Sequence, residues 1–168
     1  KAKFYIQIST LDHYTDKGKD LVDFCFQANK GEELKPLAMI ASGGELSRIM
    51  LALKSIIHGD KNGPVLVFDE VDTGVSGRIA DFMGQKLKAL SKEQQVIAIT
   101  HLPQIAAKGN VHFTIFKDFD GARTKTKLKI LNQEERIIEI AKIIGGEKIS
   151  EISLKHAEDL LLGAGNSE

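Results

Sequence analysis

The stretch VLVFDE, residues 65–70, decides the fold class of this 168-residue chain. It is a continuous run of apolar and β-branched residues that ends in two carboxylates, Asp69 and Glu70. A run of this kind is typical of a strand that is buried on both faces of a parallel sheet. A second apolar run, residues 96–100, follows a segment with helical periodicity at residues 78–90. Strand, helix and strand at this spacing predict a βαβ unit, whose crossover is right-handed in nearly all cases.

Further elements are predicted on both sides of this unit. Before it, alternating apolar residues at 1–10 indicate a half-buried strand, and a turn-like segment leads to a second strand near residues 21–28. After it, residues 111–131 predict a hairpin with Asp120-Gly121 in its turn. We therefore expect an α/β fold with a mainly parallel sheet, flanking helices and an antiparallel hairpin.

Two helices are marked by their end residues. One is predicted from Glu45 to about His58, where Gly59 ends it. The other follows Asn132 and Glu135, which stand three residues apart ahead of an apolar-periodic segment. That spacing is typical of a capping box, in which two side chains satisfy the free N–H groups of a helix start.

The composition excludes several function classes. The chain carries 23 basic and 23 acidic residues, so no overall basic surface marks this part as the main DNA-binding surface. One cysteine, Cys25, excludes an internal disulfide and agrees with a reducing compartment. No apolar run is long enough to span a membrane, and the N-terminal residues lack the apolar core of a signal peptide. We expect a soluble cytoplasmic domain.

Both strands of the predicted βαβ unit bring polar side chains to one edge of the sheet, where ligands bind in open α/β sheets. One strand places Asp69 and Glu70 there, and the other places Thr100 and His101. Taken singly, two such carboxylates most often mark the start of a solvated loop. A single histidine is usually a polar residue whose hydrogen bonds are made and that has no ligand. Together they suit phosphate chemistry: an aspartate for Mg²⁺, a glutamate to polarise water, and a histidine to bind a phosphate oxygen.

The helix near Glu45 has an unusual entrance, ASGGELS, with Gly43 and Gly44 at its start. Each glycine costs roughly 0.5–1 kcal/mol of helix stability relative to alanine. Ser42 and Glu45 have the spacing of a capping box, which explains these two residues but not the glycines. Bare glycine backbone lets an anion approach a helix N-terminus, where free N–H groups and the helix dipole favour phosphate. Both interpretations stay open on this stretch alone.

Three motifs together resemble the C-terminal half of an ABC-ATPase head, a P-loop NTPase fold. SGGELSR at residues 42–48 looks like the signature motif, VLVFDE at residues 65–70 like a Walker B strand, and AITH at residues 98–101 like the switch-histidine loop. In their residues they are most similar to the bacterial SMC-like DNA repair proteins of this superfamily. The resemblance runs from residue 29 to the final helix and so covers most of the chain.

The resemblance implies a role for the helix with the two glycines at its start. Its first residues would present hydroxyl and backbone donors to the γ-phosphate of an ATP molecule bound by the opposite head of a homodimer. These residues are Ser42, Gly43, Gly44 and Glu45.

The resemblance also implies roles at the sheet edge. Asp69 would support Mg²⁺, Glu70 would be the general base for ATP hydrolysis, and His101 would contact the γ-phosphate as a switch. A loop that crosses the dimer interface would comprise Thr73, Gly74, Val75 and Ser76. Ser76 stands where most ABC proteins have an aspartate, which leaves communication between heads through this loop open.

The phosphate-binding motif G-x-x-x-x-G-K-[ST] does not occur in this chain. In the family, that Walker A lobe is the N-terminal half of the head, and a long coiled coil joins the two halves. We therefore expect residues 1–168 to be a C-terminal lobe that partners the N-terminal half, contacts DNA through the full-length protein and hydrolyses no ATP alone. The implied function is that of an ATPase in double-strand break repair and recombination at the bacterial nucleoid.

Two other interpretations stay open. The chain could be a head lobe of another SMC-type or transporter ATPase, although Val71 stands where a transporter-type proline would be. It could also be a non-catalytic interaction module on the same fold. Intact Ser42, Glu70 and His101 argue against a decayed site.

Overall fold

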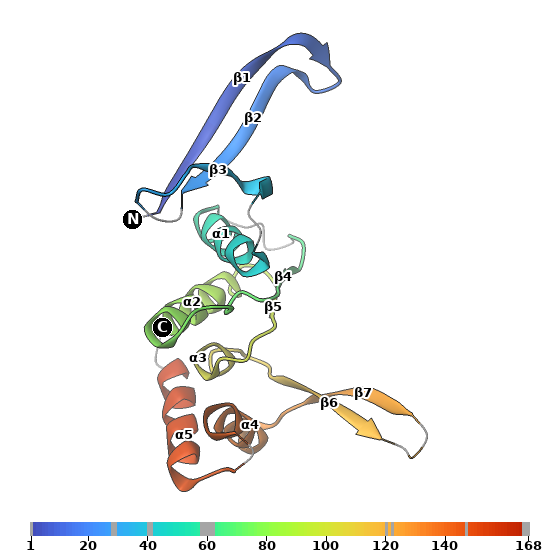
Figure 1. Cartoon of the computed structure of the whole chain (residues 1–168). Coiled ribbons are helices and arrows are strands. Elements are labelled where there is room, and N and C mark those ends of the chain that lie inside the picture. Colours follow the sequence, from blue (N-terminus) through green and yellow to red (C-terminus); the bar gives the residue numbers. More distant parts are fainter. Residues whose placement is uncertain are drawn as a thin grey trace. The chain divides into compact units, whose positions relative to one another are not determined.

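The computed structural model describes residues 2–27, 30–39, 42–57, 63–119, 121, 123–146 and 148–165 (Figure 1). The chain forms two compact units, Lys1–Leu46 and Ser47–Glu168. Their boundary falls inside helix α1 (Gly43–Ile56), which begins two residues earlier than predicted. Some predicted end and turn residues lie outside the described residues: Ala28, His58, Gly59 and Asp120.

The first unit is an antiparallel sheet of β1 (Lys3–Thr15), β2 (Gly18–Gln27) and β3 (Lys35–Pro36), followed by the 3-10 helix η1 (Leu37–Met39). The two predicted strands are confirmed, but the turn between them is shorter than expected. The Thr15 hydroxyl donates to the Gly18 carbonyl at 2.8 Å and accepts from the Lys17 N–H at 3.2 Å. These local hydrogen bonds close the hairpin immediately, so both strands extend almost to its tip.

β1 is not the half-buried strand that its alternation predicted. Ile6 and Ile8 are 58% and 66% exposed, although Cys25 of the neighbouring strand is buried. Alternation specifies which side chains share a face of a strand. It does not specify whether another element covers that face, and among the described residues of this unit no element covers the face with Ile6 and Ile8.

The second unit contains the predicted βαβ unit, formed by β4 (Leu66–Phe68), α2 (Gly77–Leu90) and β5 (Val96–Ala98). The two strands are parallel, with Leu66 opposite Val96. The short helix α3 (Pro103–Ala106) follows, with its proline in the first turn, a position that suits proline because its fixed φ fits the helix and no N–H is needed there. The helices and β4 share one core, made of Leu51, Phe68, Val71, Ala80, Met83, Leu87, Leu90 and Ile105.

Only one face of β4 and β5 is covered in the part of the chain that the structure describes. Phe68 belongs to the same apolar cluster as Leu51 of α1 and Met83 of α2. On the opposite face, Val67 is 61% exposed and Ile97 is 46% exposed. The prediction of a strand buried on both faces is therefore wrong for these residues, because the helices pack against one face of the parallel pair only.

The C-terminal part consists of a hairpin and two helices. The predicted hairpin is confirmed as β6 (Phe113–Phe119) and β7 (Thr124–Ile130), and it is followed by α4 (Gln133–Gly145) and α5 (Glu151–Gly165). The predicted capping box of α4 is also confirmed. Asn132 Oδ1 accepts from the Glu135 N–H at 2.9 Å, and the Glu135 carboxylate accepts from the Asn132 N–H at 3.1 Å. Gly146, with φ +74°, ends the helix one residue later than predicted.

The α/β class is confirmed, with helices flanking a parallel pair and an antiparallel hairpin. Most strand residues lie in antiparallel pairs, however, whereas the sequence predicted a mainly parallel sheet. Hairpins close through short local turns, while each parallel pairing needs a crossover. The parallel pair has three residues in each strand, and the strands of the two hairpins are longer. None of the helices described is both long enough and apolar enough to cross a membrane.

Replacing Ile140 by alanine is expected to destabilise the second unit by about 2–5 kcal/mol, because it leaves a cavity in a closed core. Ile140 is fully buried and packs with Ala107, Ala141 and Ala157. Urea unfolding measures the loss. The matched control is Ile152→Ala on α5, where the side chain is 82% exposed and the expected change lies within about 0.5 kcal/mol. Equal losses for the two variants would contradict this packing.

Candidate functional site

The chain reverses direction immediately after β4. Asp69 and Glu70 are exposed at the end of the strand, and Val71 is fully buried. Glu70 has φ +56°, a left-handed conformation that residues other than glycine rarely adopt. This backbone conformation places Val71 in the core while the Glu70 side chain stays at the surface. Conformations of this kind cluster at functional sites.

Two consecutive hydrogen-bonded turns follow. The Thr73 N–H donates to the Glu70 carbonyl at 3.1 Å, and the Val75 N–H donates to the Asp72 carbonyl at 3.2 Å. Gly74 occupies the third position of the second turn with φ +72°, a position that favours glycine. The backbone around Glu70 is therefore held in one conformation by its own hydrogen bonds.

The predicted interface loop is part of this turn. Thr73, Gly74 and Ser76 are exposed, and Val75 is half-buried against the core that Phe68 shares. Ser76 stands at the N-cap position of α2, but its side chain forms no capping hydrogen bond. The loop is thus a surface feature anchored by Val75.

Asp72 connects the turn to the end of β5. Its side chain is only 3% exposed, and its Oδ2 accepts from the Thr100 hydroxyl at 2.6 Å and from the His101 backbone N–H at 2.9 Å. The His101 Nδ1 lies 3.2 Å from the same oxygen, while the imidazole side chain is 72% exposed. The Thr100 hydroxyl also accepts from the Leu102 N–H at 3.0 Å. The two strand ends that carry the predicted site residues therefore meet.

Helix α1 is anchored to the same turn through backbone atoms. The Ser47 hydroxyl donates to the Asp69 carbonyl at 2.8 Å, and the Arg48 Nη1 donates to the Thr73 carbonyl at 2.8 Å. Both residues belong to the motif SGGELSR but were not among the predicted site residues. The second half of that motif thus has a structural role in holding the turn after β4.

The first half of the motif begins α1 and belongs to the first unit. The Leu46 N–H donates to the Ser42 carbonyl at 3.1 Å, which is the first helical hydrogen bond. Gly43 and Glu45 are exposed, and Gly44 is buried. The capping box predicted for Ser42 and Glu45 stays a prediction, as does the anion site.

Asp72 is the contact residue that sequence reasoning missed. No spacing rule pairs it with Thr100, because the two are 28 residues apart. The signal lay in the strand register: with Leu66 opposite Val96 in parallel strands, residues a few positions beyond each strand end come together. A polar residue beside buried Val71 then needs a partner from the end of β5.

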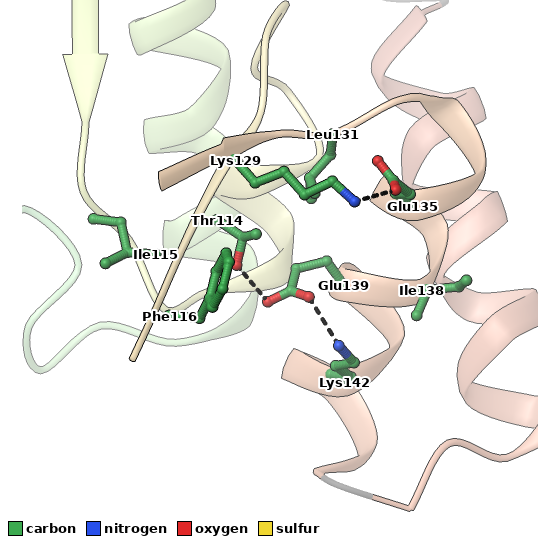
Figure 2. Close-up of a pocket in the computed structure, with 9 residues that line it drawn as sticks. All are labelled: Thr114, Ile115, Phe116, Lys129, Leu131, Glu135, Ile138, Glu139 and Lys142. Atoms are coloured by element: carbon green, nitrogen blue, oxygen red, sulfur yellow. Dashed lines mark hydrogen bonds and ion pairs between the residues drawn. The ribbon is translucent and has the colours of Figure 1, made fainter. Parts of the chain in front are cut away.

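A hollow of about 370 Å³ lies elsewhere in the second unit, between the β6–β7 hairpin and α4 (Figure 2). Its charged side chains are paired. Lys129 pairs with Glu135, and Lys142 pairs with Glu139 at 3.2 Å. The Glu139 carboxylate also accepts from the Thr114 hydroxyl at 3.0 Å. The pKa of Glu135 lies below its ordinary value because Lys129 donates to the carboxylate, and a backbone N–H adds to the effect. None of the predicted site residues lines this hollow.

The fold of this chain is that of part of an SMC-type head. The Smc head domain of Pyrococcus furiosus, solved with an extended coiled coil and the C-terminal domain of ScpA, superimposes with a TM-score of 0.50. That likeness extends over 85% of this chain and 34% of the other, at 20% sequence identity, and shows the fold alone. No family model matches the sequence.

Sequence relatives identify the family. The DNA repair protein RecN of Bacillus subtilis (strain 168) is 46% identical over 147 residues, or 88% of this chain. RecN of Haemophilus influenzae is 42% identical over 95% of the chain, and RecN of Vibrio cholerae is 41% identical over 98%. The chain is thus similar to RecN proteins along nearly all of its own length, and it spans between 26% and 30% of the length of these three relatives. The predicted resemblance to SMC-like DNA repair proteins is confirmed.

Proposed function

We propose that this chain is the C-terminal lobe of an ATP-binding and ATP-hydrolysing head, in a protein that acts in double-strand break repair and recombination. ATP held between two heads drives their dimerisation, and hydrolysis resets it. The observation that carries the proposal is the meeting of two strand ends. Glu70 leaves β4 on a turn whose Asp72 is hydrogen-bonded to Thr100 and His101 after β5.

Three side chains at this edge have roles that their positions support. Asp69 is exposed at the end of β4 and would hold Mg²⁺, an ion that proteins bind through one or two carboxylates together with phosphate oxygens and water. Bound Mg²⁺ would neutralise charge on the phosphate oxygens. Glu70, exposed beside it, would accept the proton of the attacking water. His101, whose imidazole is open to solvent, would contact the γ-phosphate.

The start of α1 would complete the ATP site of the opposite head. Gly43 and Glu45 are exposed in its first turn, where free N–H groups and the helix dipole favour phosphate. Ser42 would add its hydroxyl, and Gly44 would add a backbone donor. The exposed loop from Thr73 to Ser76 would cross the interface between the two heads.

The open apolar faces support a partner from the same protein, the N-terminal half of the head that a coiled coil would bring back to this lobe. Large exposed apolar patches in a soluble protein mark interaction surfaces. Such faces occur in both units, at Ile6 and Ile8 of β1 and at Val67 and Ile97 of the parallel pair. DNA would be contacted through the full-length protein, since this lobe has no net charge.

Cross-linking between heads tests the proposal. The full-length protein with Mg²⁺ and ATP is expected to give ATP-dependent head-to-head cross-links, and Ser42→Arg is expected to abolish them. The large side chain would prevent close approach of the γ-phosphate to the helix start. A matched control is Ser91→Arg, at the exposed end of α2. Heads that stay monomeric with Mg²⁺ and ATP would instead support a non-catalytic interaction module.

A further inference from the structure

Asp72 has none of the roles proposed above, yet its carboxylate is buried while those of Asp69 and Glu70 are exposed. Burying a carboxylate is costly unless it is paired and hydrogen-bonded. Two hydrogen bonds meet that requirement on one oxygen, Oδ2, from the Thr100 hydroxyl and the His101 backbone N–H, and the His101 Nδ1 lies 3.2 Å from the same oxygen. The contacts are therefore concentrated on the loop that carries the proposed switch.

We infer that Asp72 is a positioning residue for His101. It fixes the backbone at His101 through the N–H at 2.9 Å and orients the ring through Nδ1 at 3.2 Å. Nδ1 faces the buried carboxylate, so Nε2, on the other side of the ring, is the nitrogen open to a ligand. This inference rests on the proposed ATPase function, because the ligand concerned is the γ-phosphate.

The orientation has a consequence for ligand binding. Because Nδ1 lies 3.2 Å from the buried Asp72 carboxylate and the imidazole is 72% exposed, the solvent side of the ring, with Nε2, is the side that can contact a phosphate oxygen.

Asp72 also relates the switch to the proposed general base. Its backbone carbonyl accepts from the Val75 N–H in the second of the two turns, and the Glu70 carbonyl accepts from the Thr73 N–H in the first. The carboxylate of Asp72 contacts the loop of His101, whereas its carbonyl contacts the turns after β4. A substitution of the Asp72 side chain removes only the first contact, so its effect is expected on the loop of His101.

A double-mutant cycle in the full-length protein tests the inference. Asp72→Asn is expected to lower kcat for ATP hydrolysis on the order of 10–100-fold, by analogy with the loss of a partner that orients a metal-ligating histidine. The KM for ATP is expected to change little. In a His101→Ala background the same substitution is expected to have no further effect on kcat, because the two residues act as one unit. Asp159→Asn, at an exposed position of α5, is the matched control and is expected to leave kcat unchanged.

The outcomes separate this inference from the proposed function. If Glu70→Gln is inactive while Asp72→Asn retains wild-type kcat, the positioning role is overturned. Equal losses from Asp72→Asn with and without His101 also overturn it, since they indicate a general structural effect. If Glu70→Gln retains full activity, the ATPase role itself is wrong.

A second pair of variants decides the matter if Asp72→Asn does not fold. Thr100→Val removes the hydroxyl that donates to Asp72 at 2.6 Å, whereas Thr100→Ser keeps it. The valine variant is expected to lose kcat and the serine variant to retain it. Equal kcat values for the folded pair would overturn the inference.

Discussion

Glu70→Gln in the full-length protein is expected to lower kcat for ATP hydrolysis by about 10²–10⁴-fold, the usual contribution of a general base. ATP-bound head dimers are expected to accumulate, since binding does not require the carboxylate charge while proton transfer does. Glutamine is the suitable replacement because Glu70 has φ +56°, where a β-branched residue would add backbone strain. Steady-state phosphate release and head-to-head cross-linking in the presence of ATP measure the two effects.

The matched control for this variant is Glu158→Gln on α5, an exposed position far along the chain from the strand ends. It removes the same charge and is expected to leave kcat unchanged. Wild-type turnover by Glu70→Gln would falsify the assignment of the general base. Loss of both turnover and dimers would point to a structural role of Glu70 in the turn instead.

The chain of 168 residues alone is expected to hydrolyse no ATP, and this second effect is larger still. It lacks the G-x-x-x-x-G-K-[ST] sequence, whose backbone N–H groups and lysine hold the nucleotide phosphates in P-loop enzymes. Without them, Asp69 and Glu70 have no positioned γ-phosphate to act on. Adding the N-terminal segment of the full-length protein is expected to restore ATP-dependent dimerisation and hydrolysis, measured by phosphate release from the mixture.

A matched control for the reconstitution is an N-terminal segment whose phosphate-binding lysine is replaced by alanine. In the proposed arrangement this segment would still cover the open face of β4 and β5 but would not hold the phosphates, so solubility is expected to improve without hydrolysis. Substantial hydrolysis by the chain alone would contradict the division of the site between two segments.

The sequence predicted those features that depend on residues close together in the chain. The capping box of α4 follows from Asn132 and Glu135, three positions apart, and both of its hydrogen bonds are formed. The parallel pairing of β4 and β5 follows from two apolar runs on either side of a helical segment. In each case the physical cause is local, so one sequence window contains all of it.

The features that the sequence did not predict depend on what lies opposite a residue in space. Val67 is as apolar as Phe68, and only the position of α1, α2 and α3 decides that Phe68 is buried and Val67 is exposed. Asp72 could not be distinguished from a solvated loop residue, because its partners Thr100 and His101 are reached through the register of the two strands. The roles of Ser42, Gly43, Gly44 and Glu45 stay predictions, since they depend on a second head.

The two bonds from α1 end on carbonyl oxygens, those of Asp69 and Thr73. Every amino acid has this atom, so evolution can exchange the side chains at both positions without losing either anchor. Chemistry at these positions can therefore diverge between relatives while the scaffold stays the same. A substitution at Asp69 or Thr73 therefore changes the side chain and leaves the hydrogen bond between α1 and the backbone carbonyl in place. A loss of function in such a variant can then be attributed to the side chain.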